Sequence, residues 1–251
     1  MNEDQPMPLL AHLKELRKRL MIVVAVFALA FAGGMAVSPY ILDYLKSVPP
    51  ASGISWNVFS PWDGVKLYVN IAVFLAATAT MPFALHQLWL FVCKGMQKHE
   101  RTAALRYIPV ALLCLALGIA FGYYVVFPMS FAFVHDISAK LNVVETYGAT
   151  QYFGFMFNIV IPVGAAFELP IVVMFLTGIG LLSPNRLRKF RRYAYLILVV
   201  VSTAITPPDM MSAFIVLIPL AVLYEASVWL SGFVYRRSAA RMNAGSLQPY
   251  G

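Results

Sequence analysis

The chain has 251 residues, of which 61% are apolar and only 12% are charged, and its mean hydropathy is +0.75. A soluble domain of this length does not need so much apolar surface, so the composition excludes the soluble classes and predicts an all-α, polytopic membrane protein. The formal net charge of +8 would suit a nucleic-acid-binding protein, but the basic residues lie in short segments between apolar runs, and no nucleic-acid partner is expected.

Residues 1–20 begin as a polar segment and end in the amphipathic stretch HLKELRKRL. In a helix its leucines form an apolar stripe, whereas His12, Glu15 and Arg19 share a neighbouring face. This stretch is expected to run as an interfacial helix into the first apolar run. A signal peptide is the alternative reading of that run, but the run is longer than a usual signal core and no clear cleavage site follows it.

Six apolar segments follow, and the first four are long enough to cross about 30 Å of hydrocarbon. The fifth is short, because residues 193–205 give only about 20 Å of helix at about 1.5 Å per residue. Loop charge favours its crossing: with six spans, 16 of the 19 Lys and Arg residues lie on one side, which the positive-inside rule assigns to the cytoplasm, together with both termini. The predicted spans are about 21–42, 67–92, 107–128, 152–180, 193–206 and 213–232, in one transmembrane domain (21–235) followed by a short cytoplasmic tail (236–251).

Two external connections carry distinctive residues. The first, residues 43–65, contains Phe59 and Pro61 in an aromatic stretch that suits a membrane interface. The second joins the fifth and sixth spans, where consecutive prolines at 207 and 208 end one helix and Asp209 begins the next. Two short helices beside four full ones predict local thinning of the bilayer or a concave, partly hydrated face.

Glu168 lies in the middle of the fourth apolar segment, far from any other charge in the sequence. A carboxylate at that depth costs about 2.5–3.5 kcal/mol on insertion scales. Pro170 is expected to loosen the backbone hydrogen bonding beside it. Two readings stay open: a hydrogen bond to a neighbouring helix, and a functional cavity or partner site.

Three further carboxylates stand out. Glu225 lies within the sixth span, where a structural pair is the first expectation. Glu15 and Glu100 are acidic residues inside otherwise basic cytoplasmic segments. Each could form a weak local ion pair, Glu15 with Arg19 four residues on. Alternatively, two carboxylates at one interface form a receptor for guanidinium groups, because carboxylate and Arg pair in a bidentate and selective way.

Enzyme chemistry is not expected. The sequence lacks the nucleophile elbow, the zinc-protease helix, the phosphate-binding loop and the paired-cysteine motif. The four histidines scatter over different loops and spans, so neither a metal site nor a cofactor is expected. No internal repeat relates the two halves, which weakens a secondary-transporter assignment.

Six motifs together carry a family resemblance. They are HLKELRKRL (12–20), FSPWDG (59–64), KHER (98–101), AFELP (166–170), TPPD (206–209) and IPLAVLYE (218–225). In these motifs, their order and their spacing, the chain resembles the TatC family, the multispanning receptor subunit of the twin-arginine protein translocase. The similarity covers nearly the whole chain, from about Met7 to Phe233.

The resemblance implies a glove-like bundle of six helices in a bacterial, archaeal or organellar membrane, the inner membrane where a cell has two. It also implies export of folded proteins, driven by the proton-motive force. The implied partners are twin-arginine signal peptides, small single-span TatA- and TatB-like subunits, other copies of the chain and the lipid bilayer.

Residue by residue, the resemblance implies that Glu15 and Glu100 bind the signal's paired arginines, with His12, Arg17 and Arg19 beside them. Glu168 and Pro170 would mark the intramembrane site near the small subunits. The matching positions in the loops and the last span are Phe59, Pro61, Pro207, Asp209 and Glu225.

The chain departs from the family pattern in three places. KGMQ (94–97) replaces the usual Pro-Ala-Leu-Tyr run, MMSA follows TPPD without the common glutamine, and the tail is short. The alternative function is a proton- or ion-coupled small-molecule transporter that uses Glu168.

Overall fold

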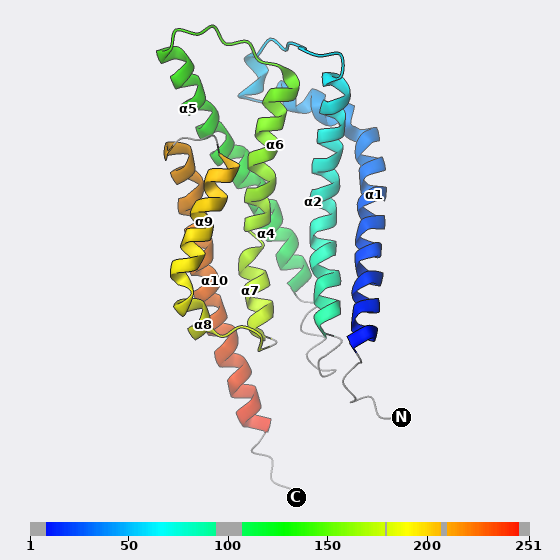
Figure 1. The fold of residues 1–251 in the computed structure, drawn as a ribbon, viewed down its shortest axis with the longest axis vertical. Helices are drawn as coiled ribbons and strands as arrows, with labels where there is room; N and C mark the ends of the chain where they lie inside the picture. The colour runs from blue at the N-terminus through cyan, green and yellow to red at the C-terminus, as the bar shows by residue number, and fades with distance from the viewer. Residues whose placement is uncertain (1–8, 94–106, 179, 207–209, 246–251) are drawn as a thin grey trace, which may run out of the picture.

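The computed structural model describes the backbone of residues 9–93, 107–178, 180–206 and 210–245. Within these ranges the protein is built from helices, and no strand is present beyond one isolated bridge between Asn57 and Gly148. The first described helix starts, and the last described helix ends, at the same end of the bundle (Figure 1). The all-α membrane class predicted from composition is confirmed.

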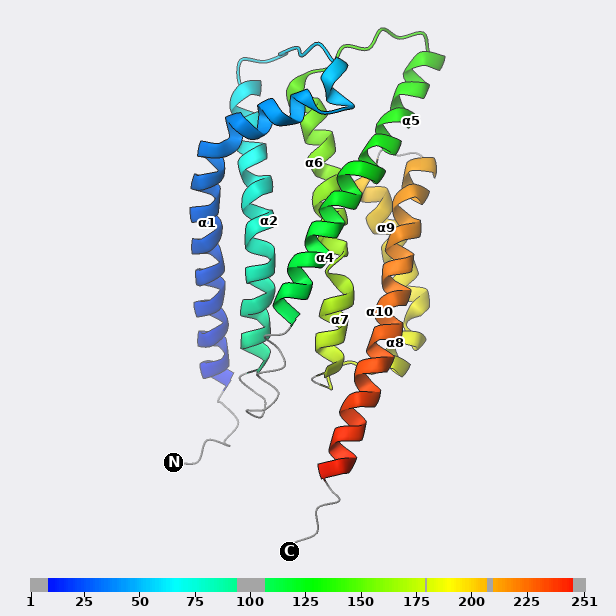
Figure 2. The ribbon, with the colours of Figure 1, turned by 180° about the vertical axis from the view of Figure 1, so that it is seen from behind.

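Two long helices form one edge of the molecule. Helix α1 (Leu9–Ser47) runs without interruption through the amphipathic stretch and the first apolar run, and contains Pro39. Helix α2 (Asp63–Cys93) packs along it, and Figures 1 and 2 show both from opposite sides. Gly34 permits this close approach, because a Cβ there would lie 3.0 Å from the Ala72 carbonyl oxygen.

The third helix is longer than the sequence predicted. Helix α4 (Tyr107–Phe121) passes through one π-helical turn, η2 (Gly122–Val126), into α5 (Phe127–Lys140), where a span was expected to end near 128. A π turn inserts an extra residue into a helix without ending it. It comes directly before Pro128, whose missing N–H removes one helical hydrogen bond.

The remaining helices surround the core. Helices α6 (Ala149–Ala166) and α7 (Leu169–Gly178) make the broken fourth span; α8 (Pro184–Lys189) and α9 (Arg191–Ile205) lead to α10 (Met210–Gly245). The main apolar core lies around α6, where Phe153, Ile159 and Val160 are buried. Helix α10 continues as helix to Gly245, past the end of the sixth predicted span.

Five helices in the described part of the chain are long and apolar enough to cross a membrane. These candidate spans lie in α1, in α2, in α4 with α5, in α6 with α7, and in α10. Helix α9 has 15 residues and is not among them. It lies beside α10 in both views and is visibly shorter than its neighbours (Figures 1 and 2).

Candidate functional site

The candidate residues of α1 lie at one end of the bundle, which we call the basic end. The start of α1, the last turn of α2, helix α8 and the far end of α10 all lie there, at the bottom of Figure 1. The connections 48–62 and 141–148 lie at the opposite end. The fold therefore brings together basic segments that are far apart in the sequence.

Glu15 and Arg19 form an ion pair within α1. The Glu15 carboxylate lies 2.7 Å from Arg19 Nε, and the side chains are only 17% and 12% exposed. Arg19 also donates through Nη1 to the side-chain oxygen of Gln87 on α2, at 3.1 Å. One guanidinium thus links the Glu15 carboxylate to the neighbouring helix, and the carboxylate is shown to accept a guanidinium group.

Arg17 lies on a different face of α1. It is exposed, and it lines an open groove together with Lys14, Lys18 and Met21. Two other predicted residues of this region fall outside what the structure describes. They are Glu100, between the ends of α2 and α4, and the side chain of His12.

Glu168 lies at a break between α6 and α7. Its backbone N–H donates to the Ala165 carbonyl at 3.1 Å, three residues back, in a tight turn between the two helices. Pro170 follows at the second position of α7 and is buried. A proline early in a helix fits there, because its missing N–H has no helical partner to lose.

The Glu168 side chain is 2% exposed, and neither carboxylate oxygen has a hydrogen-bond partner among the described residues. One turn later on α7, Ile171 packs into a small apolar cluster with Trp89, Ala111 and Phe175. The close packing of α4 on this break depends on Gly118, where a Cβ would lie 2.7 Å from Phe167 Cβ. A buried carboxylate without a partner marks a functional site more often than a structural one.

Glu225 joins α10 to α9. Its two carboxylate oxygens accept hydrogen bonds from Arg191 Nη2 at 2.7 Å and from the Tyr195 hydroxyl at 2.6 Å. A structural pair was the first expectation for this residue. Beside it lies a groove of about 450 Å³, lined by Tyr195, Ala221, Val222, Glu225, Ala226 and Trp229.

At the opposite end, the FSPWDG stretch forms a tight turn into α2. The Asp63 side chain accepts hydrogen bonds from the N–H groups of Phe59 and Ser60, at 3.1 and 3.0 Å. Phe59 also covers Gly148, where a Cβ would lie 2.7 Å from its ring. Phe59 therefore belongs to the contact between the two connections. Pro61 is exposed. Pro207 and Asp209 lie outside the described residues.

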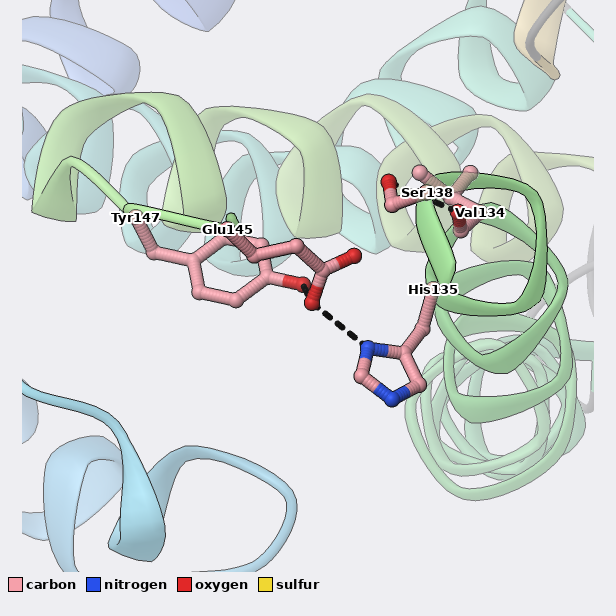
Figure 3. Close-up of polar contacts among 5 residues, drawn as sticks. All are labelled: Val134, His135, Ser138, Glu145 and Tyr147. Carbon is pink, nitrogen blue, oxygen red and sulfur yellow. Dashed lines mark hydrogen bonds and ion pairs between the residues drawn. The ribbon is translucent and has the colours of Figure 1, made fainter. Parts of the chain in front are cut away.

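A second polar cluster at this end was missed from the sequence. The Glu145 carboxylate accepts hydrogen bonds from the Tyr147 hydroxyl and from His135 Nδ1, both at 2.5 Å (Figure 3). These bonds, that of Tyr147 first, lower the pKa of Glu145. Burial and the bond to Glu145 raise the pKa of Tyr147 to about 12. Through the hydrogen bond between Glu145 and His135, the cluster links the connection 141–148 to α5.

The family model for the Sec-independent protein translocase protein (TatC) matches residues 11–219. The chain belongs to the TatC family. It is 39% identical to the Sec-independent protein translocase protein TatC of Halalkalibacterium halodurans over 237 residues, which is 94% of this chain and 93% of the relative. It is 41% identical to the protein TatCd of Bacillus subtilis over 229 residues, 91% of this chain and 93% of that one.

Solved structures agree. A crystal structure of a twin arginine translocase receptor, TatC, matches with a TM-score of 0.77 and 27% identity over 89% of this chain and 99% of that one. A second, of TatC in the detergent DDM, matches with a TM-score of 0.79 and 28% identity over 88% and 99%. The chain is thus a multi-pass membrane subunit of a protein translocase that works with other Tat subunits. This membership favours the translocase over the small-molecule transporter.

Proposed function

We propose that this chain is the signal-peptide receptor and core subunit of a translocase that exports folded proteins with twin-arginine signals, driven by the proton-motive force. The observation that carries the proposal is the Glu15 carboxylate, mostly buried at the basic end and already holding a guanidinium. A carboxylate that already holds one guanidinium is positioned to exchange it for an incoming one.

The proposed orientation places the basic end and both termini in the cytoplasm. Sixteen of the 19 Lys and Arg residues of the sequence belong to segments that lead to or from that end, whereas Lys46, Lys66 and Lys140 belong to the opposite end. The positive-inside rule then assigns the basic end to the cytoplasmic side of a bacterial, archaeal or organellar membrane. Helix α9 completes six crossings of a single domain (21–235), between the N-terminal segment (1–20) and the tail (236–251).

In the proposed recognition step, the signal's paired arginines bind Glu15 and Glu100. Arg19 holds the Glu15 site in the absence of a signal and moves aside, toward Gln87, when the signal arrives. His12 lies on the Glu15 side of α1 by helical register, one turn before it. Arg17 lies on another face of α1, in the groove with Lys14 and Lys18.

Within the membrane, Glu168 and Pro170 form the proposed contact for the small TatA- and TatB-like subunits. A polar group of a partner helix would satisfy the buried carboxylate, which has no partner among the described residues. Glu225 links α10 to α9. Pro207 and Asp209, which lie outside the described residues, and Phe59 and Pro61 are proposed as further functional positions of the loops, and other copies of this chain as further partners. No nucleic acid, metal or cofactor takes part in the proposed mechanism.

Photo-crosslinking in membranes tests the receptor site. The probe is a peptide with a twin-arginine signal and a photoreactive group beside the arginines. We compare the unmodified protein with a Glu15→Gln, Glu100→Gln variant, and the probe with one whose arginines are lysines. We expect crosslinks that need both the carboxylates and the arginines. Equal crosslinking in all arms would contradict the site, and uptake of small solutes by this subunit alone would favour the transporter.

A further inference from the structure

The outward face of α1 carries three positive charges that recognition of a cationic signal does not explain. Lys14, Arg17 and Lys18 are exposed, and none forms an ion pair with a side chain that the structure describes. They fall at successive turns of one helix, on a face other than that of the Glu15–Arg19 pair. A basic signal peptide is repelled by such a face, so its ligand is anionic.

The same face continues as an apolar surface. Met21, Ile22 and Ala25 follow the cations at helical spacing, and together with them line a groove of about 400 Å³. The exposed fraction is 60% for Met21 and 37% for Ile22. Helix α1 lies at the edge of the bundle with α2 as its packing neighbour (Figures 1 and 2), so this face of the groove looks away from the protein.

The dimensions suit one class of ligand. From Lys14 to Ala25 a helix rises about 16 Å, close to the roughly 15 Å of hydrocarbon in one leaflet. A charged head at one end and an apolar strip below it, over the depth of one leaflet, match an anionic phospholipid. The Arg17 guanidinium can hold a phosphate through two parallel hydrogen bonds, while the two lysines provide point charges on either side.

We propose that Lys14, Arg17 and Lys18 bind the headgroup phosphate of an anionic phospholipid whose acyl chain lies along Met21, Ile22 and Ala25. The lipid anchors the start of α1 at the interface and so fixes the depth of Glu15 on the neighbouring face. The proposal rests on α1 being a membrane helix, not on signal recognition. A failed signal-crosslinking experiment would therefore leave it standing.

The test uses the full chain in nanodiscs and phosphatidylglycerol with a photoreactive acyl chain, with crosslinked residues mapped by mass spectrometry. We expect crosslinks at the groove, at least fivefold weaker for phosphatidylcholine carrying the same acyl chain. The triple variant Lys14→Gln, Arg17→Gln, Lys18→Gln should lose them to a similar degree. The matched control is Arg186→Gln, Arg188→Gln, Lys189→Gln, which removes three charges from α8 at the same end of the bundle and should change the groove crosslinks little.

A second variant, Met21→Trp, keeps all three charges but fills the groove, and should weaken the acyl-chain crosslinks at Ile22 and Ala25. Equal labelling by the zwitterionic lipid, or equal loss in the α8 control, would overturn the proposal in favour of general surface charge. Displacement of the lipid by millimolar inorganic phosphate would overturn it in favour of a free-anion site. Far-ultraviolet circular dichroism confirms that each variant keeps its helices.

Discussion

Glu15 is bound to a guanidinium before any signal is present, because Arg19 lies 2.7 Å from it and is itself held by Gln87. An incoming arginine must therefore compete with a residue of the protein. The competition sets a threshold: a single weakly placed cation does not displace Arg19, whereas two arginines that also engage Glu100 can. In the proposed receptor, Arg19 tunes selectivity and does not simply add charge.

Replacing Arg19 with Gln should therefore strengthen binding of a twin-arginine peptide. The variant removes the guanidinium that competes for the Glu15 carboxylate, and we expect affinity to rise about threefold to tenfold, up to about 1.4 kcal/mol. Titration of a fluorescent peptide into the solubilised protein measures it. Arg188→Gln is the matched control, since it removes the same charge from α8 at the basic end. Equal tightening in both variants would show only weaker repulsion, and loss of binding in Arg19→Gln would contradict the competition.

The Glu145 cluster predicts a pH dependence at the opposite end. The pKa of Glu145 lies below its ordinary value of 4.5 in the folded protein, so folding favours the ionised carboxyl. This stabilisation is complete above about pH 4.5 and is lost as the pH falls through the lowered pKa. We expect faster hydrogen exchange in residues 141–148, after correction for the intrinsic rate, as the pH falls from 5 to 3. The Glu145→Gln variant should show no such step, and a step of the same size in it would contradict the assignment.

Contacts between individual side chains are what the sequence alone could not predict. A charge pattern shows that Glu15 and Glu168 are unusual, because each stands alone among residues of another kind. It does not show that Gln87, 68 positions away, holds Arg19, since that depends on which helices are neighbours. The hydrogen bonds of Tyr147 and His135 to Glu145 were also missed, because a short polar connection gives no periodic signal.

At the scale of elements, apolar runs predict that helices exist but not where they bend. The runs locate the fourth span, and Pro170 indicates loosened bonding, yet neither shows that Phe167, at the break, packs closely against Gly118 of α4. The third helix passes 128 because a π turn accommodates the sequence before Pro128. A hydropathy pattern does not show that a helix can pass a proline through a π turn.

Gly118 tests the packing at that break. A Cβ there would lie 2.7 Å from Phe167 Cβ and 2.9 Å from Gly164 Cα, so helix backbones would have to separate. We expect Gly118→Ala to destabilise the protein by about 1–3 kcal/mol, measured by denaturant titration in mixed micelles. Gly154→Ala on α6 is the control, because its Cβ would have no atom within 4 Å. Similar losses in both would show that helix flexibility, not the close approach, explains the effect.

For the whole molecule, the distribution of charge was the most informative signal, since it predicted which segments share an end before any helix was placed. Length was the second: α9 has 15 residues, which give about 22 Å of helix, against about 30 Å of hydrocarbon. If α9 crosses the membrane as proposed, the bilayer must thin beside it, and thinning costs free energy that rises with bilayer thickness. Glu168, whose carboxylate has no hydrogen-bond partner in the part of the chain that the structure describes, lies in the same bundle, where a thinner bilayer would shorten its distance from water.

This argument predicts the preferred bilayer. Reconstituted in lipids with acyl chains of about 14 to about 22 carbons, the protein should have its highest unfolding temperature in the shorter ones. Inserting Leu-Val-Leu-Ala after Val200 lengthens α9 by about 6 Å, close to one full turn, so the faces stay nearly in register. We expect this variant to prefer thicker bilayers, whereas the same insertion after Gly245, past the end of α10, should leave the optimum unchanged. A shared optimum for all three proteins would mean that α9 does not set the thickness and that its crossing must be abandoned.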